Sequence, residues 1–339
     1  MIFFYIYSLL IILLSFIFKN KGIFLNYSGD IHQSFSNKKD VPLAGGLFIL
    51  IPIVFFLNDI LINCFIISIY LVGFFSDRKV LVSPKKRFLI QCILIILFVL
   101  IYDFRINSSR IELFDIILNN KVFAILFSSF CLLILINGSN FIDGLNGLLI
   151  SYAIIIIFML SKLNLIDNSL ISDQFISQLI VILLLLLLLN VFNVLMLGDS
   201  GAYLLGFFIG ILIISSHIDN PDISPYFFIS IIWYPCFENL FSILRKLNRE
   251  FSPLKPDNKH LHQLVFFFLS KKFNMKLIVS NNFSSAIIIL FNFLVIYIST
   301  LNPASTIFQI KLIATSIIFY NVGYVLLFKF YKLNLVSKK

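Results

Sequence analysis

The sequence predicts an all-α membrane protein that crosses the bilayer many times, and three observations predict it. Of its 339 residues, 60% are apolar and 12% are charged, whereas a soluble domain has about 45–50% apolar and about 25% charged residues. The mean hydropathy is +1.02. Apolar runs long enough to cross a bilayer recur along the chain, and no large polar segment separates them. We therefore expect a polytopic helical bundle that forms one membrane-embedded domain over residues 1–339.

Eleven apolar runs predict the spanning helices. In chain order they are residues 1–18, 43–57, 60–75, 88–102, 122–136, 148–161, 176–190, 202–216, 226–243, 277–299 and 307–328. The first run lacks the positively charged start and the small-residue cleavage site of a secretory signal peptide, so we expect it to be the first spanning helix. An odd number of crossings places the two chain ends on opposite sides of the membrane.

The distribution of basic residues predicts the orientation. With the N-terminus outside and the C-terminus in the cytoplasm, 21 of the 26 lysines and arginines fall on cytoplasmic segments. Membrane proteins keep Lys and Arg in excess on cytoplasmic loops. Because the same rule accounts for the net charge of +10, we expect a lipid bilayer as partner and not a nucleic acid. The four cysteines lie in apolar runs without a metal-binding spacing, which favours packing roles.

Two polar clusters interrupt the apolar runs in the first half of the chain. Asp77 lies beside a helix end and a basic run that ends at Arg87, surroundings that keep a carboxylate ionised and able to hold a cation or orient a phosphate. Asn140, Asp143 and Asn146 are spaced to share one face of a helix, and an unpaired carboxylate at a membrane boundary favours function. The alternatives are a salt-bridged loop aspartate and a turn rich in Gly and Asn.

Two further clusters follow in the second half. Asp199 stands in a run of small residues that opens the run 202–216, where free backbone N–H groups can bind a phosphate and the carboxylate offers an oxygen for Mg²⁺. His260 and His262 lie in a basic loop and point the same way if that loop is extended, or opposite ways on a helix. Histidines there can bind phosphate, transfer protons or ligate a metal. A simple helix cap and solvated loop histidines are the alternatives.

The predicted topology brings the polar clusters to one side of the membrane. Asp77, Asp143, Asp199, His260 and His262 all fall on the cytoplasmic side, although the orientation is derived without them. Carboxylates, Mg²⁺ and basic residues at one surface are the components of phosphoryl transfer, in which the protein positions and neutralises the phosphates. Glu238, inside the run 226–243, is expected to be structural.

The residues of these motifs and their order along the chain resemble the polyprenyl-phosphate N-acetylhexosamine-1-phosphate transferase family, or glycosyltransferase family 4. Its members include the phospho-MurNAc-pentapeptide transferase. The resemblance runs from about residue 30 to 265. It is carried by PLAGG at 42–46, SD at 76–77 with the following SP and Arg87, NGSNFIDGLNGL at 137–148, GDSGAYLLGF at 198–207, FENLFS at 237–242 and HLH at 260–262.

The resemblance implies an activity and its participants. The enzyme would transfer a sugar 1-phosphate from a UDP-sugar to undecaprenyl phosphate and release UMP, as the first membrane step of an O-antigen-like or related envelope polysaccharide. It would use Mg²⁺, or Mn²⁺ in its place, at the cytoplasmic face of the bacterial inner membrane. A homodimer is compatible with the resemblance, and the identity of the sugar is left open.

The resemblance also implies roles for single residues. Asp199 matches the metal ligand, Asp143 an active-site aspartate, Asp77 a residue near the lipid phosphate, and the two histidines the start of a basic-loop motif. The expected substrate-binding residues are Asn137, Asn140, Asn146, Ser200, Gly201, Arg87 and Lys259.

Three positions depart from the family pattern. Ser76 stands where an aspartate is frequent, Asn146 where some members have aspartate, and Gln263 where many have histidine. The chemistry can proceed without the first aspartate, because a phosphate monoester with a second pKa of about 6 is largely dianionic at neutral pH. A polytopic transporter and an inactive relative that binds lipid phosphate are the alternative functions.

Overall fold

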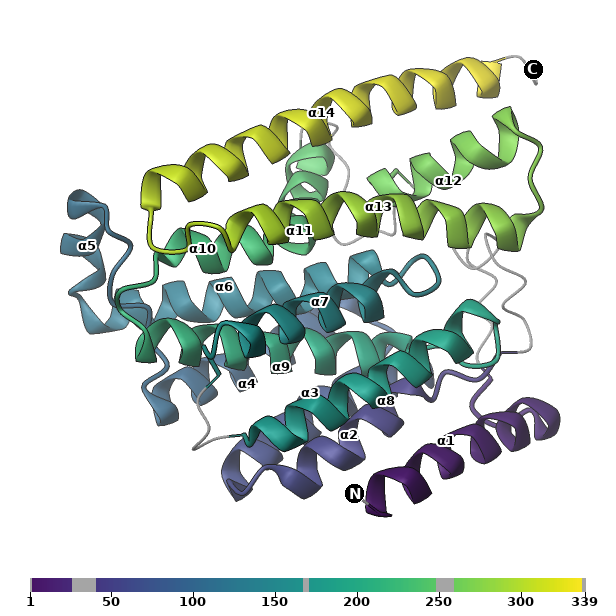
Figure 1. The fold of residues 1–339 in the computed structure, drawn as a ribbon, viewed down its shortest axis with the longest axis horizontal. Helices are drawn as coiled ribbons and strands as arrows, with labels where there is room; N and C mark the ends of the chain where they lie inside the picture. Colours follow the sequence, from purple (N-terminus) through teal and green to yellow (C-terminus); the bar gives the residue numbers. More distant parts are fainter. Residues whose placement is uncertain (1, 26–40, 167–170, 248–258, 337–339) are drawn as a thin grey trace.

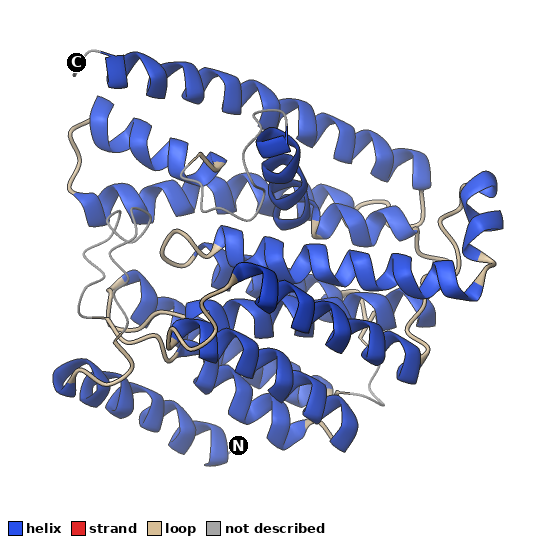
Figure 2. Cartoon of the chain, turned by 180° about the vertical axis from the view of Figure 1, so that it is seen from behind, coloured by secondary structure: helices blue, strands red, loops and turns tan. Residues whose placement is uncertain are grey.

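The structure, a computed structural model, describes residues 2–25, 41–166, 171–247 and 259–336. Over these residues the chain is helical, and no strand is present among them (Figures 1 and 2). The helices are α1 (Ile2–Lys21), α2 (Gly45–Phe56), α3 (Ile60–Asp77), α4 (Pro84–Tyr102), α5 (Glu112–Leu118), α6 (Lys121–Ile142), α7 (Leu148–Lys162), α8 (Asp173–Val191), α9 (Gly198–Asp219), α10 (Pro225–Ile231), α11 (Trp233–Leu247), α12 (Leu261–Lys272), α13 (Leu277–Ser299) and α14 (Thr306–Val336).

The predicted polytopic helical architecture is confirmed. Seven helices in the described residues, α1, α3, α6, α8, α9, α13 and α14, are long and apolar enough to cross a membrane. Helices α2 and α7 are apolar but shorter, and α4 begins with three basic residues. Each of the eleven predicted runs coincides with a helix or a bent helix pair, whereas the short helices α5 and α12 were not predicted. How many helices cross, and in which direction, stays a prediction.

The prediction of one continuous helix over 226–243 is wrong, because the chain bends by 77° between α10 and α11. Pro235 lies in the first turn of α11. Proline lacks the N–H that a helix would donate to the carbonyl four residues earlier, and its ring collides with that carbonyl. That carbonyl belongs to Ile231, the last residue of α10, and it accepts a hydrogen bond from the Tyr152 hydroxyl instead (2.9 Å).

Helix α9 forms the centre of the bundle. Of its apolar span 89% is buried, against 17% for those of α1 and α14, which lie at opposite edges (Figure 1). Glycines allow its neighbours to approach closely: Gly73 of α3 rests on the backbone of Ser200, and a Cβ on Gly46 of α2 would come within 2.5 Å of the Gly201 nitrogen. The start of α9 is therefore fixed between α2 and α3.

The chain before α2 is attached to the chain before α9. Met196 donates its N–H to the Pro42 carbonyl (2.9 Å), and its own carbonyl accepts from the N–H of Gly45 (2.9 Å). These bonds satisfy backbone groups that would be costly to leave unpaired in a membrane-embedded segment. The PLAGG motif therefore holds the N-terminus of α2 against the GDSG motif.

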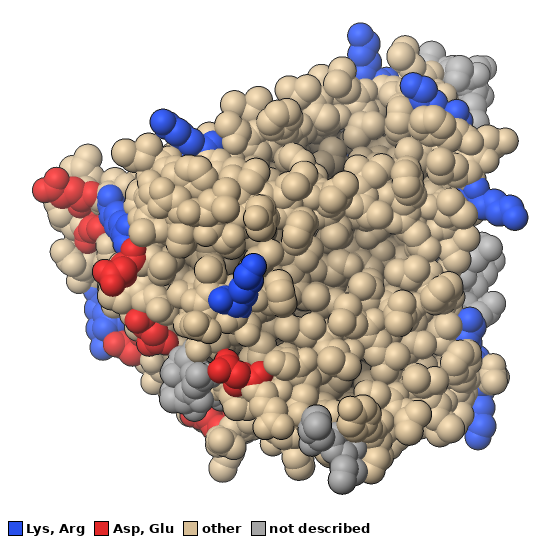
Figure 3. Space-filling model, in the orientation of Figure 1, with Lys and Arg blue, Asp and Glu red and all other residues tan. Residues whose placement is uncertain are grey.

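Charged side chains are unevenly distributed over the molecule. On the face shown in Figure 3, the acidic residues gather toward the end that carries α5, whereas only Lys and Arg are seen at the opposite end. The starts of α4 and α9 and the end of α3 meet away from α5 (Figure 1). This pattern agrees with a basic cytoplasmic end, and the orientation itself stays a prediction.

The contact between Gly73 and α9 leads to a stability prediction. Gly73→Ala places a methyl group against the Ser200 backbone, and overpacking of this kind costs about 1–3 kcal/mol, so the thermal unfolding midpoint in detergent should fall. Gly323→Ala on α14 is the matched control, since a Cβ there meets nothing within 4 Å. An equal effect of the two changes would show that the α3–α9 contact is not tight.

Candidate active site

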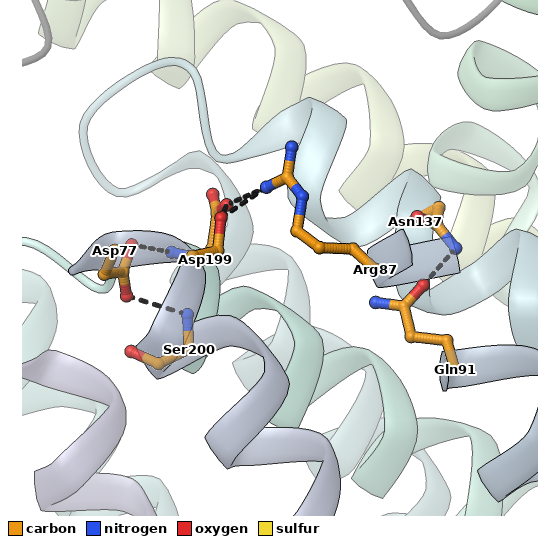
Figure 4. A network of polar contacts seen from close by, with 7 residues as sticks. Asp77, Arg87, Gln91, Asn137, Asp199 and Ser200 are labelled. Carbon is orange, nitrogen blue, oxygen red and sulfur yellow. Dashed lines mark hydrogen bonds and ion pairs between the residues drawn. The ribbon is translucent and has the colours of Figure 1, made fainter. Parts of the chain in front are cut away.

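Three helix ends bring Asp77, Arg87 and Asp199 together. Helix α3 ends at Asp77, and α9 begins one residue before Asp199. The Ser83 hydroxyl accepts the N–H of Lys86 (3.5 Å) and Pro84 follows it, a combination of residues that starts helices. The SP motif therefore begins α4 so that Arg87 lies in its first turn, facing α9 (Figure 4).

Asp77 caps the N-terminus of α9. Its Oδ1 accepts from the N–H of Asp199 (2.8 Å) and its Oδ2 from the N–H of Ser200 (3.0 Å). A carboxylate is favoured here because it meets unpaired N–H groups at the positive end of the helix dipole. Gly198 has φ +74°, and a side chain at this position would collide with Asp77. The expectation that these two N–H groups are free for a phosphate is therefore wrong.

Asp199 belongs to a network with Ser76 and Arg87. The Arg87 guanidinium contacts Asp199 Oδ2 at 2.7 Å, and the Ser76 hydroxyl donates to the same oxygen at 2.6 Å. Arg87 also donates to the Ser76 hydroxyl. The Asp199 side chain is 30% exposed, so its carboxylate is both held in place and reachable from outside the bundle.

The donor set around Asp199 suits a cation that is shared with a substrate. Among the described residues, no group of three or more His, Cys, Asp and Glu side chains forms a metal cage, and the hydrogen bonds that reach the Asp199 carboxylate there end on Oδ2. Mg²⁺ is commonly held by one or two carboxylates together with substrate phosphates and water. Asp199 fits this arrangement, with Oδ1 as the donor.

A polar contact extends this network toward α6. Gln91 lies one turn after Arg87 on α4, is fully buried, and accepts a hydrogen bond from Asn137 of α6 (3.1 Å). Asn137 also donates to the Leu133 carbonyl (2.9 Å). The contact ties α4 to the helix that carries Asp143 at its end (Figure 4).

The prediction that Asn140, Asp143 and Asn146 share a helical face is wrong. Helix α6 ends at Ile142, Asp143 is its C-cap, and Asn146 follows in a turn. The turn ends at Gly147, which takes φ +72° as the N-cap of α7. Asn140 and Asp143 are half-buried, whereas Asn146 is buried and donates to the Asn193 side chain (2.9 Å).

The two histidines lie at the start of α12 rather than in a solvated loop. His260 is the N-cap and His262 the second residue of the helix, and both are buried, at 5% and 0% exposed. Because the N-cap has extended backbone angles, the rings stay side by side, with centroids 5.5 Å apart and planes 13° apart. Gln263 accepts the His260 N–H (3.3 Å), which gives this departure from the family a capping role.

The histidines and the turn after α6 are in contact. A Cβ on Gly144 would come within 2.6 Å of His262 Nε2, and the Phe141 and His260 rings lie 5.2 Å apart. Asp143 lies between these two positions in the chain. The structure therefore brings the turn that contains Asp143 against the two histidines, and the Gln91–Asn137 contact joins α6, which leads into this turn, to α4, which carries Arg87.

The other predicted substrate-binding residues lie within or beside these groups. Ser200 and Gly201 are buried against α2 and α3. Lys259 precedes His260 and is half-buried, with its carbonyl accepting from Arg245. Residues 248–258 of the predicted basic loop lie outside the described part of the chain.

Sequence reasoning missed the role of Glu238. This residue is fully buried on α11, and its Oε1 contacts His260 Nδ1 at 2.9 Å. Its Oε2 accepts from the Tyr320 hydroxyl at 2.8 Å. A lone carboxylate inside an apolar run was the available signal, since burial of an unpaired charge is costly.

The fold and this site define a polytopic membrane protein with a polar centre suited to bind phosphates. A family model described as glycosyl transferase family 4 matches residues 59–217, which contain Asp77, Arg87, Asp143 and Asp199. Over these residues the chain is similar to glycosyl transferase family 4.

Three relatives carry the same name, undecaprenyl-phosphate alpha-N-acetylglucosaminyl 1-phosphate transferase. The chain is 23% identical to the protein of Thermotoga maritima over 247 residues, which are 72% of this chain and 75% of the relative. It is 26% identical to that of Salmonella typhi over 66% of this chain and 65% of the relative. It is 28% identical to that of Escherichia coli K12 over 38% and 37%.

The capping role of Asp77 leads to a prediction. Asp77→Asn removes the charge and one of the two acceptors, so stability should fall by about 1 kcal/mol, and hydrogen exchange of the N–H groups of Asp199 and Ser200 should accelerate. Thermal unfolding and exchange mass spectrometry measure the two effects.

Asp59→Asn is the matched control for this change. Asp59 caps α3 in a comparable way, accepting from the N–H groups of Leu61 and Ile62 at 2.9 Å each. Asp59→Asn should accelerate hydrogen exchange only at the start of α3. If Asp77→Asn leaves exchange at the start of α9 unchanged, its capping role is refuted.

Proposed function

We propose that this chain transfers an N-acetylhexosamine 1-phosphate from a UDP-sugar to undecaprenyl phosphate and releases UMP. The observation that carries this function is the meeting of Asp77, Arg87 and Asp199 at one end of the bundle. The relatives support it, since they are named undecaprenyl-phosphate alpha-N-acetylglucosaminyl 1-phosphate transferase. We place the reaction at the cytoplasmic face of the bacterial inner membrane, where the basic loops are predicted.

The reaction is one phosphoryl transfer. An oxygen of the lipid phosphate attacks the phosphorus next to the sugar, and a new P–O bond forms. The P–O bond to UMP breaks, and UMP leaves with the electron pair of that bond. Because the attacking phosphate is largely dianionic at neutral pH, no general base is needed, and Ser76 is compatible with the reaction.

The residues of the site position and neutralise the phosphates. Asp77 sets the position of α9 and therefore of Asp199. Arg87 presents a guanidinium beside the carboxylate, and a guanidinium binds phosphate in a bidentate way that also stabilises transferred charge. Asp143, His260 and His262 would face the same phosphates, whose oxygens an imidazole can bind or protonate.

Asp199 would hold a Mg²⁺ ion, or Mn²⁺ in its place, together with the diphosphate of the UDP-sugar. The ion supplies charge neutralisation on the phosphate oxygens when it is bound. Asp77 and Ser76 hold the carboxylate that would carry it, through the α9 backbone and through Oδ2 respectively.

Asp199→Asn tests the central assignment. Loss of the carboxylate should lower UMP release in purified protein with undecaprenyl phosphate by about 100-fold or more, the size of effect seen when a preorganised charge-stabilising group is removed. Asp219→Asn, at the other end of α9, is the control and should keep normal turnover. Near-normal UMP release by Asp199→Asn would refute the assignment.

Removal of divalent cations tests the metal. EDTA should abolish UMP release, and added Mg²⁺ or Mn²⁺ should restore it. Mn²⁺ binding followed by electron paramagnetic resonance should be present in the unmodified chain and lost in Asp199→Asn. Full turnover in EDTA would exclude a metal from the reaction.

A panel of labelled UDP-N-acetylhexosamines distinguishes this function from its alternatives. UMP and a labelled lipid product from one sugar identify the substrate. Uptake of a solute into vesicles without UMP would indicate a transporter instead. Binding of undecaprenyl phosphate without any product would indicate an inactive relative.

A further inference from the structure

We propose that the C-terminal helix α14 positions His260 in the active site through two tyrosines, Tyr320 and Tyr324. The inference rests on the proposed function in one respect, namely that His260 acts on the phosphates. Helix α14 lies beyond the region matched by the family model, which ends at residue 217.

The first connection runs through a buried carboxylate. Tyr320 donates to Glu238 Oε2 (2.8 Å), and Glu238 Oε1 contacts His260 Nδ1 (2.9 Å) and the N–H of Leu261 (3.4 Å). A carboxylate only accepts hydrogen bonds, so Nδ1 of the imidazole must carry the proton. Glu238 thereby fixes both the tautomer and the orientation of the ring, and leaves Nε2 as the atom that can meet a substrate.

The second connection runs through the backbone. Arg245 donates to the Tyr324 hydroxyl (2.6 Å) and also to the carbonyl of Lys259. Lys259 immediately precedes His260, so this bond fixes the backbone from which the imidazole extends. The side chain and the backbone of His260 are therefore held by separate paths that both end on α14.

The two tyrosines form one unit. They lie one helical turn apart, with rings 6.2 Å apart and nearly parallel, and Phe241 of α11 contacts both rings at 5.3 and 4.8 Å. Tyr320 is 2% and Tyr324 6% exposed, on a helix whose span is only 17% buried. Both hydroxyls bond to side chains of α11, Glu238 and Arg245, which in turn hold His260 and the residue before it. This arrangement indicates positioning rather than general packing.

The experiment uses the full-length chain with Tyr320→Phe and Tyr324→Phe, singly and together. These changes remove one hydroxyl each and keep the rings. The control is Tyr331→Phe on the same helix, whose ring packs on Phe267 at 4.8 Å. The chain has four histidines, so ¹⁵N-histidine spectra can be assigned with His260→Gln.

The double variant should shift the His260 ¹⁵N signals away from the pattern of a single Nδ1–H tautomer and lower kcat for UMP release by about tenfold, a fraction of what positioned acid–base groups contribute. KM for the UDP-sugar should stay within about twofold, since the tyrosines act on His260 through Glu238 and Arg245 rather than on the nucleotide. Tyr331→Phe should leave both readouts unchanged. Glu238→Gln, which keeps the shape of the side chain but not its charge, should shift the same signals.

The two readouts separate this inference from the proposed function. If the unmodified chain releases no UMP from any UDP-sugar, the proposed function fails, and the histidine spectra alone decide the positioning. Unchanged His260 signals in the double variant would overturn the inference. Changed signals with unchanged kcat would show that the tyrosines hold a histidine that the reaction does not use, which also overturns it.

Discussion

The carboxylate of Asp77 at the N-terminus of α9 is the interaction on which the rest of the site depends. It satisfies two N–H groups that a buried helix end would otherwise leave unpaired, a cost that few membrane-embedded segments can bear. It also joins the end of α3 to the start of the central helix. Asp199 lies at that junction, so the position of its carboxylate follows from the way α9 is capped.

The fold was largely predictable from the sequence because membrane helices are encoded by composition. Each apolar run became a helix, since a bilayer leaves the backbone no other partner than itself. The errors came at helix ends. Pro235 divides a run that looks continuous. Helix α6 ends at Ile142, so Asn140 and Asn146 lie on opposite sides of a helix end that their spacing does not reveal.

The sequence predicted which residues belong to the candidate site, but not how those residues contact one another. Topology placed Asp77, Asp143 and Asp199 at one end, but spacing along the chain does not report which oxygen meets which N–H group. The capping role of Asp77 arises from a contact over 122 residues. The role of Glu238 was not predicted for a similar reason. Its partners lie at the start of α12 and on α14, and nothing near Glu238 in the sequence indicates them.

The ion pair between Arg87 and Asp199 competes with ligand binding at both side chains. While they are paired, the guanidinium and the carboxylate neutralise one another and neither is fully available. A cation that takes the carboxylate frees the guanidinium, and an anion that takes the guanidinium frees the carboxylate. A cation and an anion that bind in this way would therefore bind cooperatively, and by thermodynamic reciprocity each would strengthen the binding of the other by the same factor.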